Sequence, residues 1–213
     1  MESKNYQDDL SHIRQMMERS SRFISLSGIS GVFAGFFALL GAGYAYWLLF
    51  GIGIYGENSG ENINDLYRKT FVLDGIVGQL ILVAILVLIA AIGAGVFFTM
   101  RKSKKNNLKV WDKTTKKLLF NFAVPLATGG LFCAGILFHG LHALLSPATL
   151  IFYGLALFNA GNYTFSDVKY LGICQIVLGI ISLFFLGYGL FFWAIGFGVL
   201  HIVYGIIMHK KYR

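Results

Sequence analysis

The distribution of charged residues constrains this chain more than any other feature of its sequence. Four long stretches contain no Asp, Glu, Lys or Arg: 23–56, 75–100, 118–166 and 170–209. A helix needs about 20 apolar residues to cross the hydrocarbon core of a bilayer, because each residue adds about 1.5 Å to its length. Each of the four stretches is long enough to cross at least once. The sequence therefore predicts a protein that crosses a membrane several times.

The composition and the N-terminal segment agree with this prediction. Of 213 residues, 56% are hydrophobic and 13% are charged, and the mean hydropathy is +0.67. The apolar run after residues 1–22 is longer than the core of a signal peptide, so we expect these residues to belong to the mature protein. Tyr6, Leu10, Ile13 and Met17 recur there at helical spacing. They predict a short amphipathic helix that packs on the membrane surface or on this protein's own loops, or docks a partner or second subunit.

The four stretches divide into six predicted transmembrane helices. The first two hold one helix each, and the last two are long enough for two, with turns marked by Pro147 and by Gly187–Tyr188–Gly189. The predicted fold is an all-α polytopic membrane bundle of three hairpins in a single domain, 23–209, followed by a basic tail, 210–213. The predicted spans are 23–50, 71–100, 118–138, 143–160, 169–186 and 190–208.

The positions of Lys and Arg predict the orientation of this bundle. Cations near the ends of the spans should lie on the cytoplasmic side. With the N-terminus inside, all of the 18 Lys and Arg except Arg68 and Lys69 fall on that side. An odd number of spans in either long stretch would displace Lys169 or the tail to the other face. The sequence therefore predicts six spans, both termini in the cytoplasm, and a multi-pass protein of the inner (cytoplasmic) membrane.

The most basic segment is the loop RKSKKNNLKVWDKTTKK, residues 101–117, where eight Lys and Arg accompany one acid, Asp112. Such a cluster suits the phosphates of nucleic acid as well as anionic lipid headgroups. Because no nucleic-acid-binding fold surrounds the loop, we expect membrane lipids, including anionic phospholipid, and no nucleic acid as its partners. The predicted headgroup ligands are Arg101, Lys102, Lys104, Lys105 and Lys109.

Glycine spacing predicts an internal repeat and close helix packing. GISGVFAGFFALLGAGY (28–44) aligns without a gap to GICQIVLGIISLFFLGY (172–188), pairing Gly28 with Gly172, and Tyr153–Gly154 is matched by Tyr204–Gly205. Small residues let transmembrane helices approach closely. The alignment predicts that hairpins repeat about an axis along the membrane normal, with close contacts inside the bundle or in a homo-oligomer. The predicted packing glycines are Gly31, Gly35, Gly172 and Gly179.

This hairpin pattern resembles the six-helix HdeD-like bacterial membrane proteins. PATLIFYGLALFNAG (147–161) and GICQIVLGIISLFFLGYGLFFWAIGFGVLHIVYGIIM (172–208) carry the resemblance through glycines about seven apart on the outgoing helix and a small residue within the returning one. The resemblance implies a six-helix architecture and a link to acid-stress resistance. It implies no settled molecular activity and supplies no catalytic residue.

Polar residues inside the apolar stretches are the candidate functional residues. Deep in the last span is His201, about 16 Å from its start near Leu190 and near the middle of a roughly 30 Å core, where a histidine should not face lipid. Burial should keep it neutral near pH 7, and acidification would then charge it. The alternative is a core histidine bonded to a backbone carbonyl or to Tyr204. A cavity open to the cytoplasm would be lined by Asn121, Asn159, Gln175 and His201.

Two further histidines, His139 and His142, have the spacing of a metal or haem site if one helix includes both. They also fit a simpler role, capping helix ends at the interface. No Ser-His-Asp set, paired carboxylates or phosphate-binding loop appears, so we expect no cofactor and favour a protein that is not an enzyme. The sequence thus favours a non-enzymatic membrane protein that binds lipid or a protein partner, in envelope or acid stress. The alternative is a small transporter or channel with a cavity around His201.

Overall fold

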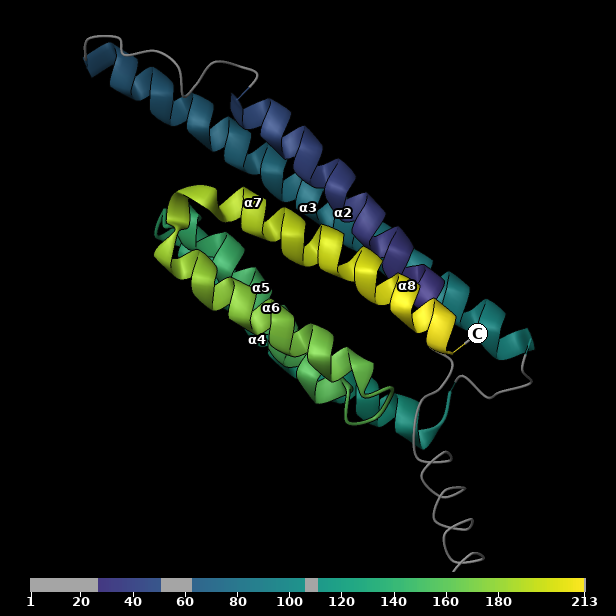
Figure 1. Cartoon of the computed structure of the whole chain (residues 1–213). Coiled ribbons are helices and arrows are strands. Elements are labelled where there is room, and N and C mark those ends of the chain that lie inside the picture. The colour runs from purple at the N-terminus through teal and green to yellow at the C-terminus, as the bar shows by residue number, and fades with distance from the viewer. Residues whose placement is uncertain (1–26, 51–62, 106–110, 213) are drawn as a thin grey trace, which may run out of the picture.

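The structure is a computed structural model that describes residues 27–50, 63–105 and 111–212. This part of the chain is a bundle of helices with no strand (Figure 1), which confirms the all-α prediction. The predicted N-terminal helix, 1–22, and Lys109 lie outside the described residues. The long helices are α2 (Gly28–Phe50), α3 (Ile63–Lys105), α4 (Lys113–Phe138), α5 (Leu145–Ala160) and α6 (Asp167–Phe184).

The last span is a continuous rod with a change of helix type inside it. The 3-10 turn η2 (Leu186–Tyr188) leads into α7 (Gly189–Trp193), a π-helical segment η3 (Ala194–Leu200) and α8 (His201–Lys211). Another 3-10 turn, η1 (His142–Leu144), precedes α5. We refer to 189–211 as the C-terminal rod.

Within the residues that the structure describes, six helices are long and apolar enough to cross a membrane, which confirms the predicted number of spans. The candidate spans are Gly28–Leu49, Gly75–Lys105, Lys113–Phe138, His142–Ala160, Asp167–Phe184 and Leu186–Lys211. The orientation with both termini in the cytoplasm stays a prediction.

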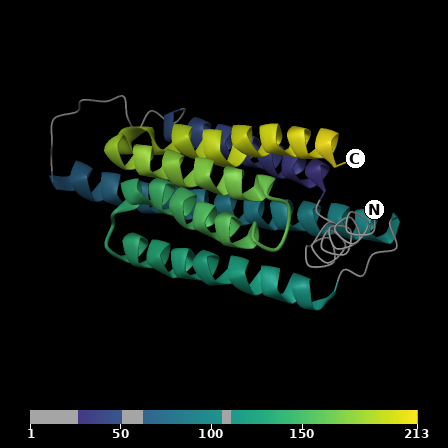
Figure 2. The ribbon, with the colours of Figure 1, turned by 60° about the horizontal axis from the view of Figure 1, so that its bottom comes forward.

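The helices do not pack in the order in which they follow along the chain. Helices α2 and α3 form one hairpin, and α4, α5 and α6 form a second group (Figure 1). The C-terminal rod lies between them, packed against α2 on one side and against α5 and α6 on the other. Figure 2 shows α4 at the edge of the bundle, on the far side of α5 from α2 and α8. The first and last spans are therefore neighbours.

Glycines form close helix contacts between α2 and α8 and between α6 and α5. A methyl group built on Gly28 would lie 2.5 Å from the carbonyl oxygen of Gly205, and one built on Gly172 would lie 2.7 Å from that of Gly154. Neither position leaves space for a side chain. The sequence alignment pairs Gly28 with Gly172, and the Tyr-Gly match pairs Gly154 with Gly205, so aligned residues occupy corresponding places in the two contacts.

All four predicted packing glycines lie against another helix. Methyl groups built on Gly31 and Gly35 would lie 3.2 Å from Gly205 Cα and 2.5 Å from the Gly198 carbonyl oxygen, both on the C-terminal rod. Gly179 faces Ile151 of α5, where the built methyl would be 3.0 Å from the backbone nitrogen. Close approach of backbones is what small residues permit in membranes, where no hydrophobic effect drives helices together.

Local chemistry explains where α4 and α5 begin. Asp112 is the N-cap of α4, and its carboxylate accepts hydrogen bonds from the backbone N–H and the hydroxyl of Thr115, each 2.7 Å long. These bonds hold the pKa of Asp112 below its ordinary value. Gly140, with φ of +69°, makes the turn after α4. Pro147 lies in the first turn of α5, where its missing N–H leaves no helical bond unmade.

Candidate functional site: a polar network at the π-helical segment

The most distinctive polar site in the described chain surrounds His201, at the junction of the π-helical segment with α8. His201 is 6% exposed and Gln175 of α6 is fully buried. A π-helical segment, with i→i+5 hydrogen bonds, is rare and is found frequently at functional sites. Here the backbone N–H of His201 bonds to the carbonyl of Gly198. The carbonyl of Gly196 accepts hydrogen bonds from side chains.

Three side chains and one backbone carbonyl make up the network. The Tyr153 hydroxyl, from α5, lies 2.9 Å from His201 Nε2. The other ring nitrogen, His201 Nδ1, lies 2.9 Å from the Gly196 carbonyl oxygen. Gln175 Nε2 donates to the same oxygen at 2.7 Å. The network therefore ties α5 and α6 to the C-terminal rod inside the bundle.

The acceptor at the centre of the network fixes where the protons are. A carbonyl oxygen only accepts, so His201 Nδ1 carries a proton and Nε2 accepts from the Tyr153 hydroxyl. For the same reason, the Gln175 amide is oriented with its nitrogen, not its oxygen, toward the Gly196 carbonyl. The 3.5 Å between Gln175 Nε2 and His201 Nδ1 separates two donors aimed at one oxygen, so it is not a hydrogen bond between them. All of these bonds suit the neutral imidazole.

Aromatic rings and a glycine enclose the network. The Phe197 ring stacks on the His201 ring at 6.0 Å between centroids and lies 5.1 Å from that of Tyr153. A methyl group built on Gly196 would lie 2.6 Å from Gln175 Oε1, so only glycine leaves room for the buried amide. These neighbours hold the histidine in one orientation.

Three buried polar atoms in the described part of the chain have no hydrogen-bond partner. They are Gln175 Oε1, Ser182 Oγ and the hydroxyl of Tyr204. Each such atom destabilises the folded state, because on burial the group loses its hydrogen bond to water and gains none in return. Tyr204 was one predicted partner of His201, yet Tyr153 takes that place. The other predicted bond, to a backbone carbonyl, is present.

The structure brings together two of the four predicted cavity residues. Gln175 and His201 meet in the network, whereas Asn121 donates to the carbonyl of Lys117 in its own helix. Asn159 is at the end of α5, and its carbonyl accepts from Asn162 in the following turn. Among the described residues, neither asparagine is hydrogen-bonded to the network.

The two histidines proposed as metal or haem ligands lie at the turn between α4 and α5. Helix α4 ends at Phe138, so His139 and His142 do not share one helix. Both are exposed, and His139 is the C-cap of α4. Among the described residues, no group of three or more His, Cys, Asp or Glu is arranged to hold a metal ion.

A second polar cluster lies where the C-terminal rod ends. Asp167 forms a 2.9 Å ion pair with Lys211 and accepts a 2.7 Å hydrogen bond from the Tyr212 hydroxyl. Partial burial and the bond to Asp167 raise the pKa of Tyr212. The Tyr212 ring packs on Phe165 at 4.0 Å, and its carbonyl accepts from Lys102 Nζ at 3.2 Å. This cluster joins the ends of α3, α6 and α8.

The sequence reasoning missed Tyr153 and Gly196 as site residues. Tyr153 was noted only as half of a repeated Tyr-Gly pair, and Gly196 is one of 26 glycines. The close pair Gly196–Phe197–Gly198, five to three residues before a buried histidine, is the one local signal for an irregular helix there. Comparisons with protein-family models, with curated proteins and with solved structures gave no match to this chain.

Proposed function

We propose that this chain is a non-enzymatic integral membrane protein that binds anionic phospholipid. The observation that supports the proposal is the surface of α3. No residue in the most apolar window of this helix is buried, although the helix contacts α2. The helix ends in exposed cations. Its aliphatic surface suits acyl chains and its charged end suits acidic headgroups.

We assign some of the cations at the C-terminal end of α3 to lipid headgroups and one to contacts within the protein. Arg101, Lys104 and Lys105 are exposed on the last turns of α3. Lys102 is partly buried and bonds to the Tyr212 carbonyl, so we assign it to the fold and the other three to headgroups. A cation at a helix C-terminus is also favourable for the helix dipole. The first turns of α4 add the exposed cations Lys113, Lys116 and Lys117.

The buried network is less suited to the alternative function of a small transporter or channel. A conduction path needs polar groups that line a continuous route through the bundle. Gln175 and His201 are buried and bond to Gly196 and Tyr153, while the two asparagines lie elsewhere. We therefore interpret the network as a structural tie between helices. Membership of the HdeD-like group, a role in envelope or acid stress, and a homo-oligomer remain proposals.

The test of the proposed function is lipid that co-purifies with the protein. In the variant with Arg101, Lys104 and Lys105 changed to Gln, anionic phospholipid should be lost. Each cation near a charged surface contributes about 1 kcal/mol, so three should change affinity on the order of a hundredfold. The measurement is mass spectrometry of lipids extracted from detergent-purified protein.

The matched control changes Arg68 and Lys69, near the other end of the same helix, to Gln. This variant should keep its anionic phospholipid, because the proposal assigns these cations to the opposite side of the membrane. Equal amounts of anionic lipid in the triple variant and the parent would refute the proposed function.

A further inference from the structure

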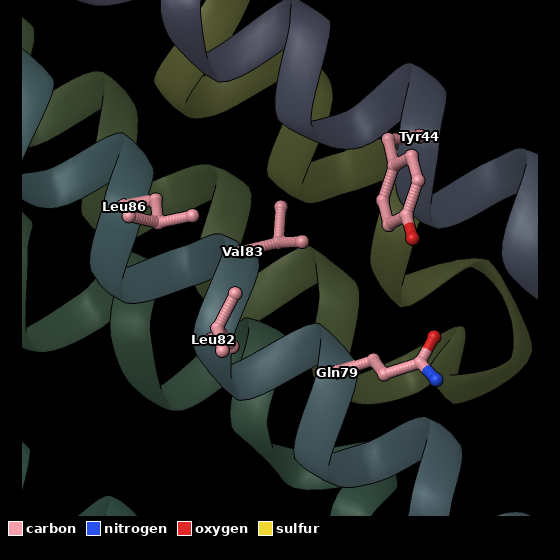
Figure 3. A pocket seen from close by; sticks show the side chains of 5 residues that line it. All are labelled: Tyr44, Gln79, Leu82, Val83 and Leu86. Atoms are coloured by element: carbon pink, nitrogen blue, oxygen red, sulfur yellow. The ribbon is translucent and has the colours of Figure 1, made fainter.

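The hairpin of α2 and α3 contains a groove of about 310 Å³ that the polar network does not use. Leu82, Val83 and Leu86 of α3 form its wall, and Tyr44 and Gln79 lie at one end (Figure 3). Beyond the groove the two helices come together, because a methyl group built on Gly41 would lie 2.6 Å from Val87 Cγ2. The groove is thus an opening between helices that are tightly packed further along.

The two polar groups at the groove have no hydrogen-bond partner in the described part of the chain. Figure 3 shows the Tyr44 hydroxyl turned toward the side of the groove where the Gln79 amide lies, yet the two are not bonded to each other. An amide without a partner is destabilising where water is scarce. Both groups can donate a hydrogen bond. A ligand that fits them offers an acceptor.

The depth of the groove matches one leaflet of a bilayer. Gln79 lies four residues from Gly75, where the span begins, and so about 6 Å inside it. Leu86 lies about 16 Å inside, close to the middle of a roughly 30 Å core. The exposed aromatic residues Tyr46 and Trp47 of α2 belong to the same end of the span, as is common at a membrane interface. The groove therefore runs from the interface to the bilayer midplane.

We infer that this groove binds one phospholipid of the adjacent leaflet, with an acyl chain along Leu82, Val83 and Leu86 and an ester carbonyl accepting hydrogen bonds from Gln79 and Tyr44. The inference rests on the proposed function, since it adds a second lipid contact at the end of α3 opposite to the basic residues. An ester carbonyl accepts and does not donate, which suits two donors. The acyl chain suits the aliphatic wall.

A second copy of the chain fits the groove less well. A stable interface covers about 800 Å² on each partner, whereas five side chains line this groove. In a bilayer, the molecule that reaches an opening between two spans from the side is lipid. The chemistry of the groove therefore favours a single lipid chain.

The test uses zwitterionic phosphatidylcholine with a diazirine in its acyl chain, at low mole fraction in vesicles that contain the full-length protein. After illumination, peptide mass spectrometry locates the adducts. Leu82, Val83 and Leu86 should be labelled several-fold above Ile85 and Leu88, which are exposed on other faces of α3. Equal labelling on all faces would show only bulk lipid and overturn the inference.

Two leucines of similar exposure provide a matched pair of variants. Leu86→Trp fills the groove, whereas Leu88→Trp adds the same ring on a face outside it; the two leucines are 56% and 51% exposed. The excess labelling of Leu82 and Val83 should disappear in the first variant and persist in the second. Persistence in both would overturn the inference. So would a disulfide between copies that carry Cys at position 82, since it would place a second chain in the groove.

Two further variants separate the headgroup contact and the proposed function. Gln79→Leu should reduce the excess labelling of Leu82 and Val83 about fivefold, which is the effect of one lost hydrogen bond. No change in this labelling would overturn the contact between Gln79 and the ester carbonyl. The variant of Arg101, Lys104 and Lys105 should keep full groove labelling while it loses anionic lipid. If the excess labelling disappeared in that variant, the groove would not be a lipid site separate from the basic end of α3. Anionic lipid retained there, with groove labelling intact, would refute the basic-end proposal alone.

Discussion

Replacing Gly35 with alanine should destabilise the bundle, because the α2 helix has no space for a side chain where it meets the C-terminal rod. The added methyl would lie 2.5 Å from the Gly198 carbonyl oxygen and 2.9 Å from the backbone nitrogen of Ile202. An ordinary van der Waals contact begins near 3.4 Å, so α2 and the rod would have to separate by about 0.9 Å (3.4 minus 2.5). Neither neighbouring atom belongs to a flexible side chain that could move aside.

The expected destabilisation follows from two opposing effects. Overpacking a close contact costs about 1–3 kcal/mol, since a gap of this size removes part of the dispersion energy along the whole seam. Alanine also favours a helix over glycine by about 1 kcal/mol. Gly43 provides the control, because it lies on the same helix and a methyl there would meet nothing within 4 Å. The difference between the two variants isolates the packing cost.

The assay is thermal unfolding in detergent, followed by circular dichroism. For a chain of this size, 1 kcal/mol shifts the melting temperature by about 2–4 °C. Gly35→Ala should therefore melt about 2–12 °C below Gly43→Ala, and Gly35→Leu lower still. If Gly35→Ala melts as high as Gly43→Ala, the close α2–α8 contact is refuted, together with the role assigned to its glycines.

Three further predictions concern the network, a helix cap and the orientation. Tyr153→Phe leaves His201 Nε2 without a donor and should lower the unfolding free energy by about 1–3 kcal/mol, whereas Tyr170→Phe, at a residue 68% exposed, should not; equal melting temperatures for the two would contradict the network. Asp112→Ala should lower the unfolding free energy by about 1 kcal/mol near neutral pH. Because the pKa of Asp112 is lowered in the folded state, the stabilisation by this cap is present above the ordinary pKa of 3.8 and is lost as pH falls through the folded pKa. A stability difference between variant and parent that persists in strong acid would argue against the cap. Single cysteines at positions 59 and 107, in a background without the two native cysteines, should differ toward an impermeant maleimide: Ser59→Cys reacts from outside and Asn107→Cys does not, and the reverse would end the model with both termini inside.

The number of helices could be predicted from the sequence because it depends on properties that are local along the chain. A charge in the hydrocarbon core is costly, so stretches without charge such as 75–100 predict where the spans lie. Pro147 and Gly187 divide the two longest stretches for reasons of backbone geometry that also act locally. The four packing glycines were predicted from the same kind of local signal, since their spacing is visible in one helix at a time.

The partners of these residues could not be predicted, because they join distant parts of the chain. In a soluble protein the polar face of a helix shows which side is buried, but spans such as α3 are apolar all round and lipid is as apolar as the interior. Nothing in the sequence therefore indicates that His201 bonds to Tyr153, or that Asn121 faces away.

What the sequence by itself determined is the all-α class, the six spans and the places where they turn, because bilayer thickness and the cost of buried charge act on each segment separately. What only the tertiary structure decided is which helices touch and which polar atoms meet. The packing of α8 against α2, the π-helical segment and the shared Gly196 carbonyl arise from contacts between whole helices. Packing and hydrogen bonding between helices select one arrangement among many that have equally apolar surfaces.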